Sequence, residues 1–493
     1  MSHILSKSTY LLGVQCKKAL YLNKYHKDLK DEYTEDQKAI FAQGNKVGKL
    51  AQNLFPGGID ATPDTFYDYS KSLEQTKNAI GDGAPVIYEA AFQYNGVLCA
   101  VDILVRDGDR WNAYEVKSST SVKETNIIDA SLQYHVMKNC GIDINDISIV
   151  VIDNSYQRQG DIELEKLFKI QSVLSEVLQL QSSVKNNLLE LKNVLSKREI
   201  PNELIGSKCS SPYDCSFKSN CWKDVPEYSI FNLAKIKKKQ AEKLYHSGVT
   251  LITDLPYDYK LTSSQAYQVQ ADRDGSVIIN KNNLRSFTDQ LEYPLHFLDF
   301  ETTNMAVPEF ELQRSYQQIP FQYSVHIKNR KTSDAIHHEF LAESKCKDPR
   351  LDFIKSLIRD CGKNGSILVY NIGFERSILN QLIKSFPEYE SQLQLIIDRM
   401  VDLMIPFKNK HYYTPEMQGS YSIKKVLPAL CPDLSYQDLE IKEGGTASRI
   451  FGNMLKGDFN GDEINTRKQL LKYCQRDTWA MVKILDEIYF QIA

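Results

Sequence analysis

From residue 291 onward, apolar segments of strand length are followed by segments with the apolar spacing of helices. Three strand-like segments come first, and a helix, a fourth strand and a further helix follow. They lie at residues 294–303, 320–328, 337–343, 348–362, 366–371 and 374–386, and a long helix-like segment occupies 465–493. This order predicts an α/β domain in which helices cover the faces of a sheet.

The N-terminal half contains a second sheet signal, a meander between residues 84 and 119. Its strand-like segments are separated by Asn95-Gly96 and by the sequence DGD at 107–109, which favour tight turns between antiparallel strands. A helix-like segment at 126–141 and a short apolar strand at 147–153 follow. From 161 to about 196, apolar residues recur at three- and four-residue intervals, which predicts one long helix or two.

A chain of 493 residues is long enough for two or three domains. We expect a first domain at 1–225, a helical connector at 226–290 and an α/β domain at 291–493. The lysines at 235–243 suit either a helix-hairpin-helix-like element that touches phosphates or a solvated helix face.

The charge and hydropathy of the chain limit the possible partners. The 60 Lys and Arg residues against 63 Asp and Glu give a formal charge of -3, so nothing in the overall charge indicates nucleic acid, although a local basic channel remains compatible with it. The apolar stretch at the N-terminus is too short for a signal peptide, and no apolar run reaches the length of a membrane span. We therefore expect a soluble, cytoplasmic protein.

Two carboxylates stand one residue apart at the first strand of the C-terminal domain. Asp299 and Glu301 share one face, because side-chain direction alternates along a strand. This pair alone would also suit a solvated strand end. Glu375, in the first turn of a later helix, and Asp477, one helical turn after Tyr473, add two further acids. Because buried carboxylates repel one another and lose hydration, the four acids predict a site for divalent cations.

The sequence of DxE, Asn-x-x-Phe-acid and Tyr-x-x-x-Asp resembles the DnaQ-like 3′→5′ exonucleases of the ribonuclease H fold, in the DEDDy type whose third motif carries tyrosine. The resemblance covers residues 291–493. It implies that the four acids hold two Mg²⁺ or Mn²⁺ ions and that Tyr473 orients or helps to activate the attacking water. The family has aspartate where this chain has Glu375. Asp402 is a further acid, which we interpret as a plain loop acid rather than a reserve ligand.

The meander of the N-terminal half carries a second set of ionisable residues. Glu115 and Lys117 share a strand face, and Asp102 on the neighbouring strand can meet them. Two carboxylates that bind a divalent cation, with a lysine that stabilises the charge of the transition state, form a workable phosphodiesterase site. The same three residues also suit an ordinary cross-strand salt bridge.

Together with Gly96, Asp129 and Gln133, these residues resemble the PD-(D/E)xK nucleases, close to the RecB-like and CRISPR-associated exonuclease branch. The resemblance implies a restriction-endonuclease-like fold for the first domain, with one or two metal ions held by Asp102 and Glu115 and catalytic roles for Lys117 and Gln133. Two positions depart from the pattern of the branch. Gly48 stands where the branch has a metal-binding histidine, and Met137 stands where it has a tyrosine.

The same branch carries an iron–sulfur cluster, held by one cysteine near the N-terminus and three after the nuclease core. This chain has the same layout, in Cys16, Cys209, Cys215 and Cys221. The resemblance implies a 4Fe-4S cluster on these four thiolates. Zn²⁺ accepts the same ligand set, and we favour the cluster over zinc.

The two halves together resemble a bacterial family that fuses a RecB-like nuclease bearing an iron–sulfur cluster to a DnaQ-like exonuclease. We therefore predict a metal-dependent nuclease that hydrolyses DNA, as a 3′→5′ exonuclease in repair or defence. Two alternatives stay open. One is a nucleic-acid-binding iron–sulfur module whose nuclease sites have decayed, and the other is an exonuclease that acts on RNA. The expected partner is nucleic acid, DNA rather than RNA, and no membrane.

Overall fold

The computed structural model describes residues 4–65, 68–345 and 347–493. The chain is mixed α/β and divides into two compact units. Unit 1 comprises Met1–Asp224 and Ala306–Tyr316, and unit 2 comprises Val225–Met305 and Gln317–Ala493. Among the helices in the described ranges, none is both long and apolar enough to cross a membrane.

Unit 1 is built on a sheet with the strand order β2-β3-β4-β5-β6-β7, and a short strand, β1, pairs with the start of β4. The strands are β1 (Leu5–Ser6), β2 (Ile59–Asp60), β3 (Val86–Tyr94), β4 (Val97–Asp107), β5 (Arg110–Val116), β6 (Ile144–Ile152) and β7 (Phe168–Ser172). The expected meander is present as β3, β4 and β5, which pair antiparallel in sequence order. Strand β6 then lies parallel to β5, after the crossover helix α5 (Glu124–Asn139).

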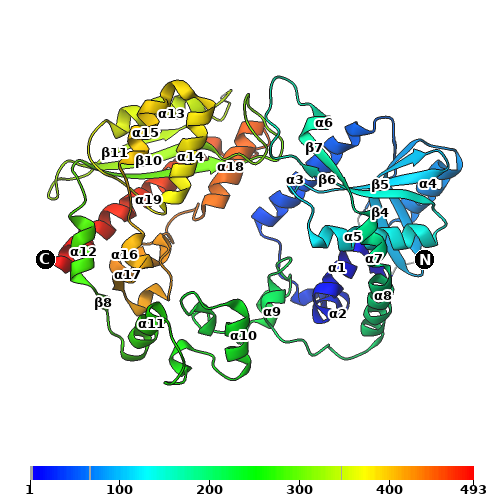
Figure 1. The fold of residues 1–493 in the computed structure, drawn as a ribbon, viewed down its shortest axis with the longest axis horizontal. Coiled ribbons are helices and arrows are strands. Elements are labelled where there is room, and N and C mark those ends of the chain that lie inside the picture. The colour runs from blue at the N-terminus through cyan, green and yellow to red at the C-terminus, as the bar shows by residue number, and fades with distance from the viewer. Residues whose placement is uncertain (1–3, 66–67, 346) are drawn as a thin grey trace. The chain divides into compact units, whose positions relative to one another are not determined.

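Helices cover both faces of this sheet (Figure 1). Side chains of α5 and α8 share one apolar core with inward residues of the sheet, and side chains of α3 share another core on the opposite face. The remaining helices complete the unit: α1 (Lys7–Gln15), α2 (Lys17–Tyr25), α3 (Glu35–Ala51), α4 (Ser70–Gly81), α6 (Leu164–Leu167), α7 (Leu174–Gln179), α8 (Gln181–Ser196) and α9 (Lys218–Cys221).

The segment 161–196 differs from the expected one or two helices, because strand β7 interrupts it. Phe168 is buried, and the other four residues of β7 are exposed. The strand pairs antiparallel with β6 at the edge of the sheet. Pairing with an available strand edge has therefore overridden the helical spacing of the apolar residues.

Unit 2 contains a five-stranded sheet with the order β11-β10-β9-β12-β13. Its strands are β9 (Leu295–Thr303), β10 (Ile319–Lys328), β11 (Ile336–Leu341), β12 (Ile367–Val369) and β13 (Met400–Asp402). Strands β9, β10 and β11 are antiparallel, whereas β12 is parallel to both β9 and β13. A separate two-stranded sheet joins β8 (Ile278–Ile279) to β14 (Tyr412–Tyr413).

Strand β9 is covered on both faces, by α13, α14 and α15 on one side and by α19 on the other (Figure 1). Leu298 and Phe300 pack in the core of the first face, and Leu295 and Phe297 pack in the core that includes α19. The helices of unit 2 are α10 (Lys238–His246), α11 (Ser263–Asp274), α12 (Lys281–Thr288), α13 (Arg350–Cys361), α14 (Ile372–Ser385), α15 (Glu390–Asp398), α16 (Ile405–Lys408), α17 (Ile423–Leu430), α18 (Gly444–Lys456) and α19 (Glu463–Ile492). Since side chains alternate along a strand, the odd-numbered acids of β9 face α19.

Candidate functional site

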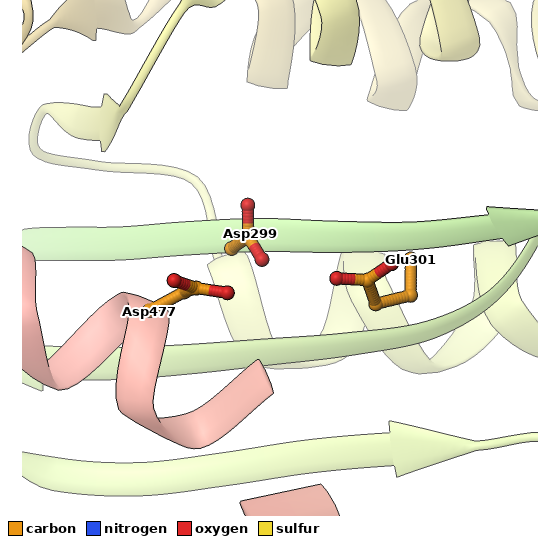
Figure 2. A group of neighbouring side chains, drawn as sticks. All are labelled: Asp299, Glu301 and Asp477. Atoms are coloured by element: carbon orange, nitrogen blue, oxygen red, sulfur yellow. The ribbon is translucent and has the colours of Figure 1, made fainter. Parts of the chain in front are cut away.

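Strand β9 and helix α19 bring three carboxyl groups together. Asp299 and Glu301 project from β9 and Asp477 from α19, and one ligand oxygen from each lies within 4.8 Å of the others (Figure 2). Asp299 is partly buried, whereas Glu301 and Asp477 are buried. Among the described residues, this triad is the group whose spacing suits a single metal ion.

Glu375 stands beside this triad without joining it. It lies in the first turn of α14, is 2% exposed, and its Oε2 has no hydrogen-bond partner in the described structure. Its charge is among those that raise the pKa of Asp299, so the two carboxyl groups are near each other. A buried carboxylate oxygen that has no hydrogen-bond partner and lies next to three other acids is available to coordinate a cation.

Asp402 has a structural role at the end of β13. Its Oδ1 accepts hydrogen bonds from the backbone N–H groups of Asn371, at 3.1 Å, and Met404, at 3.0 Å. Asn371 precedes α14 with a left-handed φ of 83°, so Asp402 fixes the unusual backbone from which Glu375 projects.

Burial makes these acids hold protons more tightly than acids in water do. It raises the pKa of Glu301 to about 8, with a further rise from the charge of Asp477. It also raises the pKa of Glu375 to about 8 and that of Asp477 to about 6. The pKa of Asp299 rises well above its ordinary value through burial and through repulsion by the other acids. A divalent cation would displace these protons and relieve the repulsion, so the four carboxyl groups fit such an ion.

Tyr473 lies one turn before Asp477 in α19 and reaches the same site. A Cβ atom placed on Gly444, the first residue of α18, would lie 3.4 Å from Oε2 of Glu301 and 3.9 Å from the Tyr473 hydroxyl. Burial and the surrounding carboxylates raise the pKa of this phenol. Tyr473 therefore stays protonated in the metal-free site and can donate a hydrogen bond to a water or an oxyanion.

Two further residues belong to this site, although no motif in the sequence indicated them. Tyr436 donates a 2.6 Å hydrogen bond to Oδ1 of Asp477. Lys424, at the start of α17, lowers the pKa of both Glu301 and Asp477, and its Nζ donates to Oε2 of Glu443 at 2.7 Å. Both residues lie in a loop-rich region whose folding against α19 is a tertiary effect, so their spacing in the sequence carries no periodic signal.

The four candidate residues of the N-terminal half also lie together. Lys117 contacts Oε1 of Glu115 at 2.5 Å, and Gln133 of α5 donates to Oε2 of Glu115 at 2.8 Å. Asp102 is joined to them through the backbone, because its Oδ2 accepts the N–H of Val116 at 2.6 Å. The four residues therefore meet, but Lys117 pairs with Glu115 two residues away and with Asp129 of α5, not across the strands with Asp102.

The pKa values of Asp102 and Glu115, the two acids expected to bind metal in the N-terminal site, are shifted in opposite directions. Burial and the charge of Glu115 raise the pKa of Asp102 to about 6. Burial would also raise the pKa of Glu115, but the ammonium groups of Lys117 and Lys7 hold it below its ordinary value. Glu115 therefore remains ionised, and Asp102 is the acid that a cation would recruit.

Two residues of this site, Lys7 and Glu89, were not indicated by the sequence, and Asp129, which was named there without a role of its own, joins them. Asp129 accepts a 2.9 Å bond from Lys117, and Lys7 contacts Glu115 at 2.7 Å. Glu89 of β3 has a left-handed φ of 54°, and burial together with the charge of Asp102 raises its pKa to about 8. Among these three residues, helical spacing indicates only Asp129, which falls one helical turn before Gln133.

The four cysteines come from two separate segments of unit 1. Cys16 separates α1 from α2, and Cys215 and Cys221 pack with it around Phe217. The backbone N–H of Cys215 donates to the carbonyl of Cys209 at 2.9 Å. The sulfur atoms do not form a tight group, since no three of them approach within 4.8 Å of one another. Zn–S bonds of about 2.3 Å in a tetrahedron would require shorter sulfur separations than this.

Comparisons with known proteins cover part of the chain. A family model described as a domain of unknown function (DUF2779) matches residues 296–422, which include Asp299, Glu301 and Glu375. The chain is also similar to "Uncharacterized protein UU173" of Ureaplasma parvum serovar 3, with 27% identity over 221 residues. That match covers 38% of this chain and 30% of the relative, so the matched region spans less than a third of the relative's length.

Proposed function

We propose that the protein is a divalent-metal-dependent nuclease that hydrolyses phosphodiester bonds of DNA, with the carboxylates of β9 and α19 as its main catalytic centre. The observation that carries this proposal is the convergence of Asp299, Glu301 and Asp477, with ligand oxygens within 4.8 Å of one another. Four neighbouring acids with raised pKa values are typical of functional sites, and divalent cations would neutralise their repulsion.

The topology of unit 2 supports a ribonuclease H-like assignment. Three antiparallel strands lead into two parallel strands through helical connections, and the paired acids lie on the central strand β9. We extend the proposal to a 3′→5′ direction of degradation because DxE, Glu375 and Tyr473-x-x-x-Asp477 follow the order of the exonuclease motifs.

In this site Asp299, Glu301 and Asp477 would hold Mg²⁺ or Mn²⁺, with Glu375 completing the ligand set. Two such ions, when bound, lower the pKa of an attacking water and stabilise the leaving oxygen. Tyr473 would orient that water by hydrogen bonding, and Lys424 would offset part of the negative charge of the site. Tyr436 would keep Asp477 ionised and fix its orientation.

The N-terminal half would contribute a PD-(D/E)xK-like site that either cuts as well or holds the strand. The contacts among Asp102, Glu115, Lys117 and Gln133 support this assignment. We also propose that the four cysteines hold a 4Fe-4S cluster, because no three of their sulfur atoms lie within 4.8 Å of one another and a cluster spans a wider set of thiolates than a zinc ion does.

Cleavage assays test this proposal and assign activity to one half. The protein is incubated with Mn²⁺ and 5′-labelled single-stranded DNA, duplex DNA or RNA, and Asp299→Asn and Lys117→Ala are compared with the wild type. We expect a ladder of products shortened from the 3′ end that persists in Lys117→Ala and disappears in Asp299→Asn. If the wild type cleaves none of these substrates, the proposal is wrong, and if activity survives in the Asp299→Asn/Lys117→Ala double variant, the catalytic residues lie elsewhere.

A further inference from the structure

The N-terminal site contains a second lysine that its sequence motif does not include. Lys7 is the first residue of α1 and follows β1, which pairs parallel with Val97 and Leu98 at the start of β4. Its Nζ lies 2.7 Å from Oε1 of Glu115 and 3.8 Å from Oδ2 of Asp129. The pairing of β1 and the hydrogen bond from the Thr9 N–H to the Ser6 hydroxyl hold Lys7 at this point.

Lys7 and Lys117 are engaged by the same two acids. Lys117 contacts Oε1 of Glu115 at 2.5 Å and Oδ2 of Asp129 at 2.9 Å. Since Gln133 donates to Oε2 of Glu115, both oxygens of this acid already have donors. Two ammonium groups thus balance Glu115 and Asp129, whereas Asp102 and Glu89 have no ammonium contact among the described residues.

Other oxygen atoms of the site remain without an ammonium contact. Asp102 accepts the backbone N–H of Val116 through Oδ2, and Glu89 lies partly buried beside it. The side-chain oxygen of Gln133 is buried and has no partner in the described structure. Carboxylate and amide oxygens of this kind can coordinate a divalent cation, so metal binding and the two lysines do not compete for the same acids.

Solvent reaches the two lysine side chains more than it reaches the two acids. The side chains of Lys7 and Lys117 are 27% and 25% exposed, whereas those of Glu115 and Asp129 are 2% and 3% exposed. An anion that enters from solvent therefore reaches the lysine side chains more readily than the carboxylates. Ammonium groups bind phosphate oxygens as point charges, and the buried acids keep both lysines charged and in place.

We propose that Lys7 and Lys117 form a phosphate-binding pair for a nucleic-acid strand in the N-terminal site. This inference deepens the proposed function, because it names the phosphodiester group as the ligand of the N-terminal half. It involves no bond rearrangement. If Lys7 formed only a structural salt bridge, its replacement would leave phosphate binding unchanged. Phosphate binding therefore distinguishes the two roles.

Binding without metal tests the pair. The affinity of the full chain for a fluorescent single-stranded oligonucleotide, DNA or RNA, is measured by anisotropy in EDTA over a range of salt concentrations. Lys7→Met should weaken binding by about tenfold. The negative slope of the logarithm of the association constant against the logarithm of the salt concentration should become shallower by about 0.7, the value for one phosphate contact on a single strand. Lys7→Arg should retain both the affinity and the slope.

Lys17→Met is the matched control, because Lys17 lies in the same unit and pairs with the exposed Glu190. If Lys7→Met binds like the wild type, or if Lys17→Met loses as much affinity and slope, the proposal is wrong. A loss of folding in Lys7→Met that Lys7→Arg fails to rescue would also count against it.

The binding measurement in EDTA does not depend on cleavage. The nuclease proposal can therefore fail, through an inactive wild type, while the lysine pair stands, and the reverse also holds.

Discussion

Tyr436 donates a 2.6 Å hydrogen bond to Oδ1 of Asp477, and it does so from a position 41 residues earlier in the chain. Asp477 is buried, and this bond opposes the rise of its pKa that burial causes. The tyrosine therefore favours the ionised carboxylate that a cation requires, without being a ligand itself. Outer partners of this kind orient metal ligands and tune their basicity.

Tyr436→Phe should shift the pH dependence of metal binding upward. A hydrogen bond to a charged group contributes about 1.5 kcal/mol, which corresponds to about one pKa unit. Because the pKa of Asp477 rises when the donor is removed, the midpoint for Mn²⁺ affinity should move up by about one pH unit. Calorimetric titrations with Mn²⁺ at a series of pH values measure this midpoint.

Tyr323→Phe is the control for this substitution, since Tyr323 donates a 2.6 Å bond to Asp360 outside the site. It should reduce stability and leave the midpoint for Mn²⁺ unchanged. An unshifted midpoint in Tyr436→Phe would show that the bond does not influence metal binding.

The metal-free protein should lose stability as the pH rises from about 7 to about 8.5. The pKa of Glu301 is raised to about 8, against an ordinary value of about 4.3, so the folded state binds more protons than the unfolded state in this range. Stability therefore falls as the proton is lost. Above about pH 7 the histidines are mostly neutral in both states and contribute little to the slope.

Thermal melts in EDTA and in Mn²⁺ check this prediction. The decrease should be smaller in Glu301→Gln, which cannot ionise, and should be preserved in Asp398→Asn, an exposed acid on α15. Mn²⁺ should raise the melting temperature most at the alkaline end. A metal-free melting temperature that increases over this range would contradict the raised pKa.

Glu375→Asp should lower activity, even though aspartate is the residue of the family that the C-terminal half resembles. The Glu375 side chain lies beside the triad but outside the 4.8 Å group, and a side chain shorter by one methylene would withdraw further. We expect Mn²⁺ affinity and cleavage rate to fall by about tenfold, within the range for weakened metal sites. Glu375→Gln should lose more. An aspartate variant as active as the wild type would mean that the backbone here follows the family geometry.

Cys215→Ser should remove the metal centre of the N-terminal unit. The anaerobically purified wild type should be brown and contain iron and sulfide, and the variant should be colourless and melt at a lower temperature, because cluster binding contributes to folding. Cys140→Ser, at an exposed thiol, should retain colour and stability. A colourless wild type with stoichiometric zinc would contradict the cluster.

Much of the fold was readable from the sequence because its strands are bounded by clear turn signals. Strand β3 spans the expected residues, and β9 ends where the paired acids stand. Strand β7 was missed, since its apolar residues have helical spacing and only the free edge of β6 makes them a strand.

The candidate sites were predictable where residues share one element and unpredictable where they meet across elements. Asp299 with Glu301, and Tyr473 with Asp477, follow from strand and helix periods. Lys7 reaches Glu115 from 108 positions away, through a two-residue strand that no periodicity reveals.

The central claim is that the acids of β9 and α19 hold the cations that drive hydrolysis. It is tested most directly by the Mn²⁺-dependent rate of nucleotide release from the 3′ end of a labelled single strand, in the wild type and in Asp299→Asn. Asp398→Asn, at an exposed acid on α15, serves as the control. We predict that Asp299→Asn loses more than the roughly 100-fold that an outer partner costs, while the control stays near the wild type. Equal rates in the wild type and Asp299→Asn would contradict the claim.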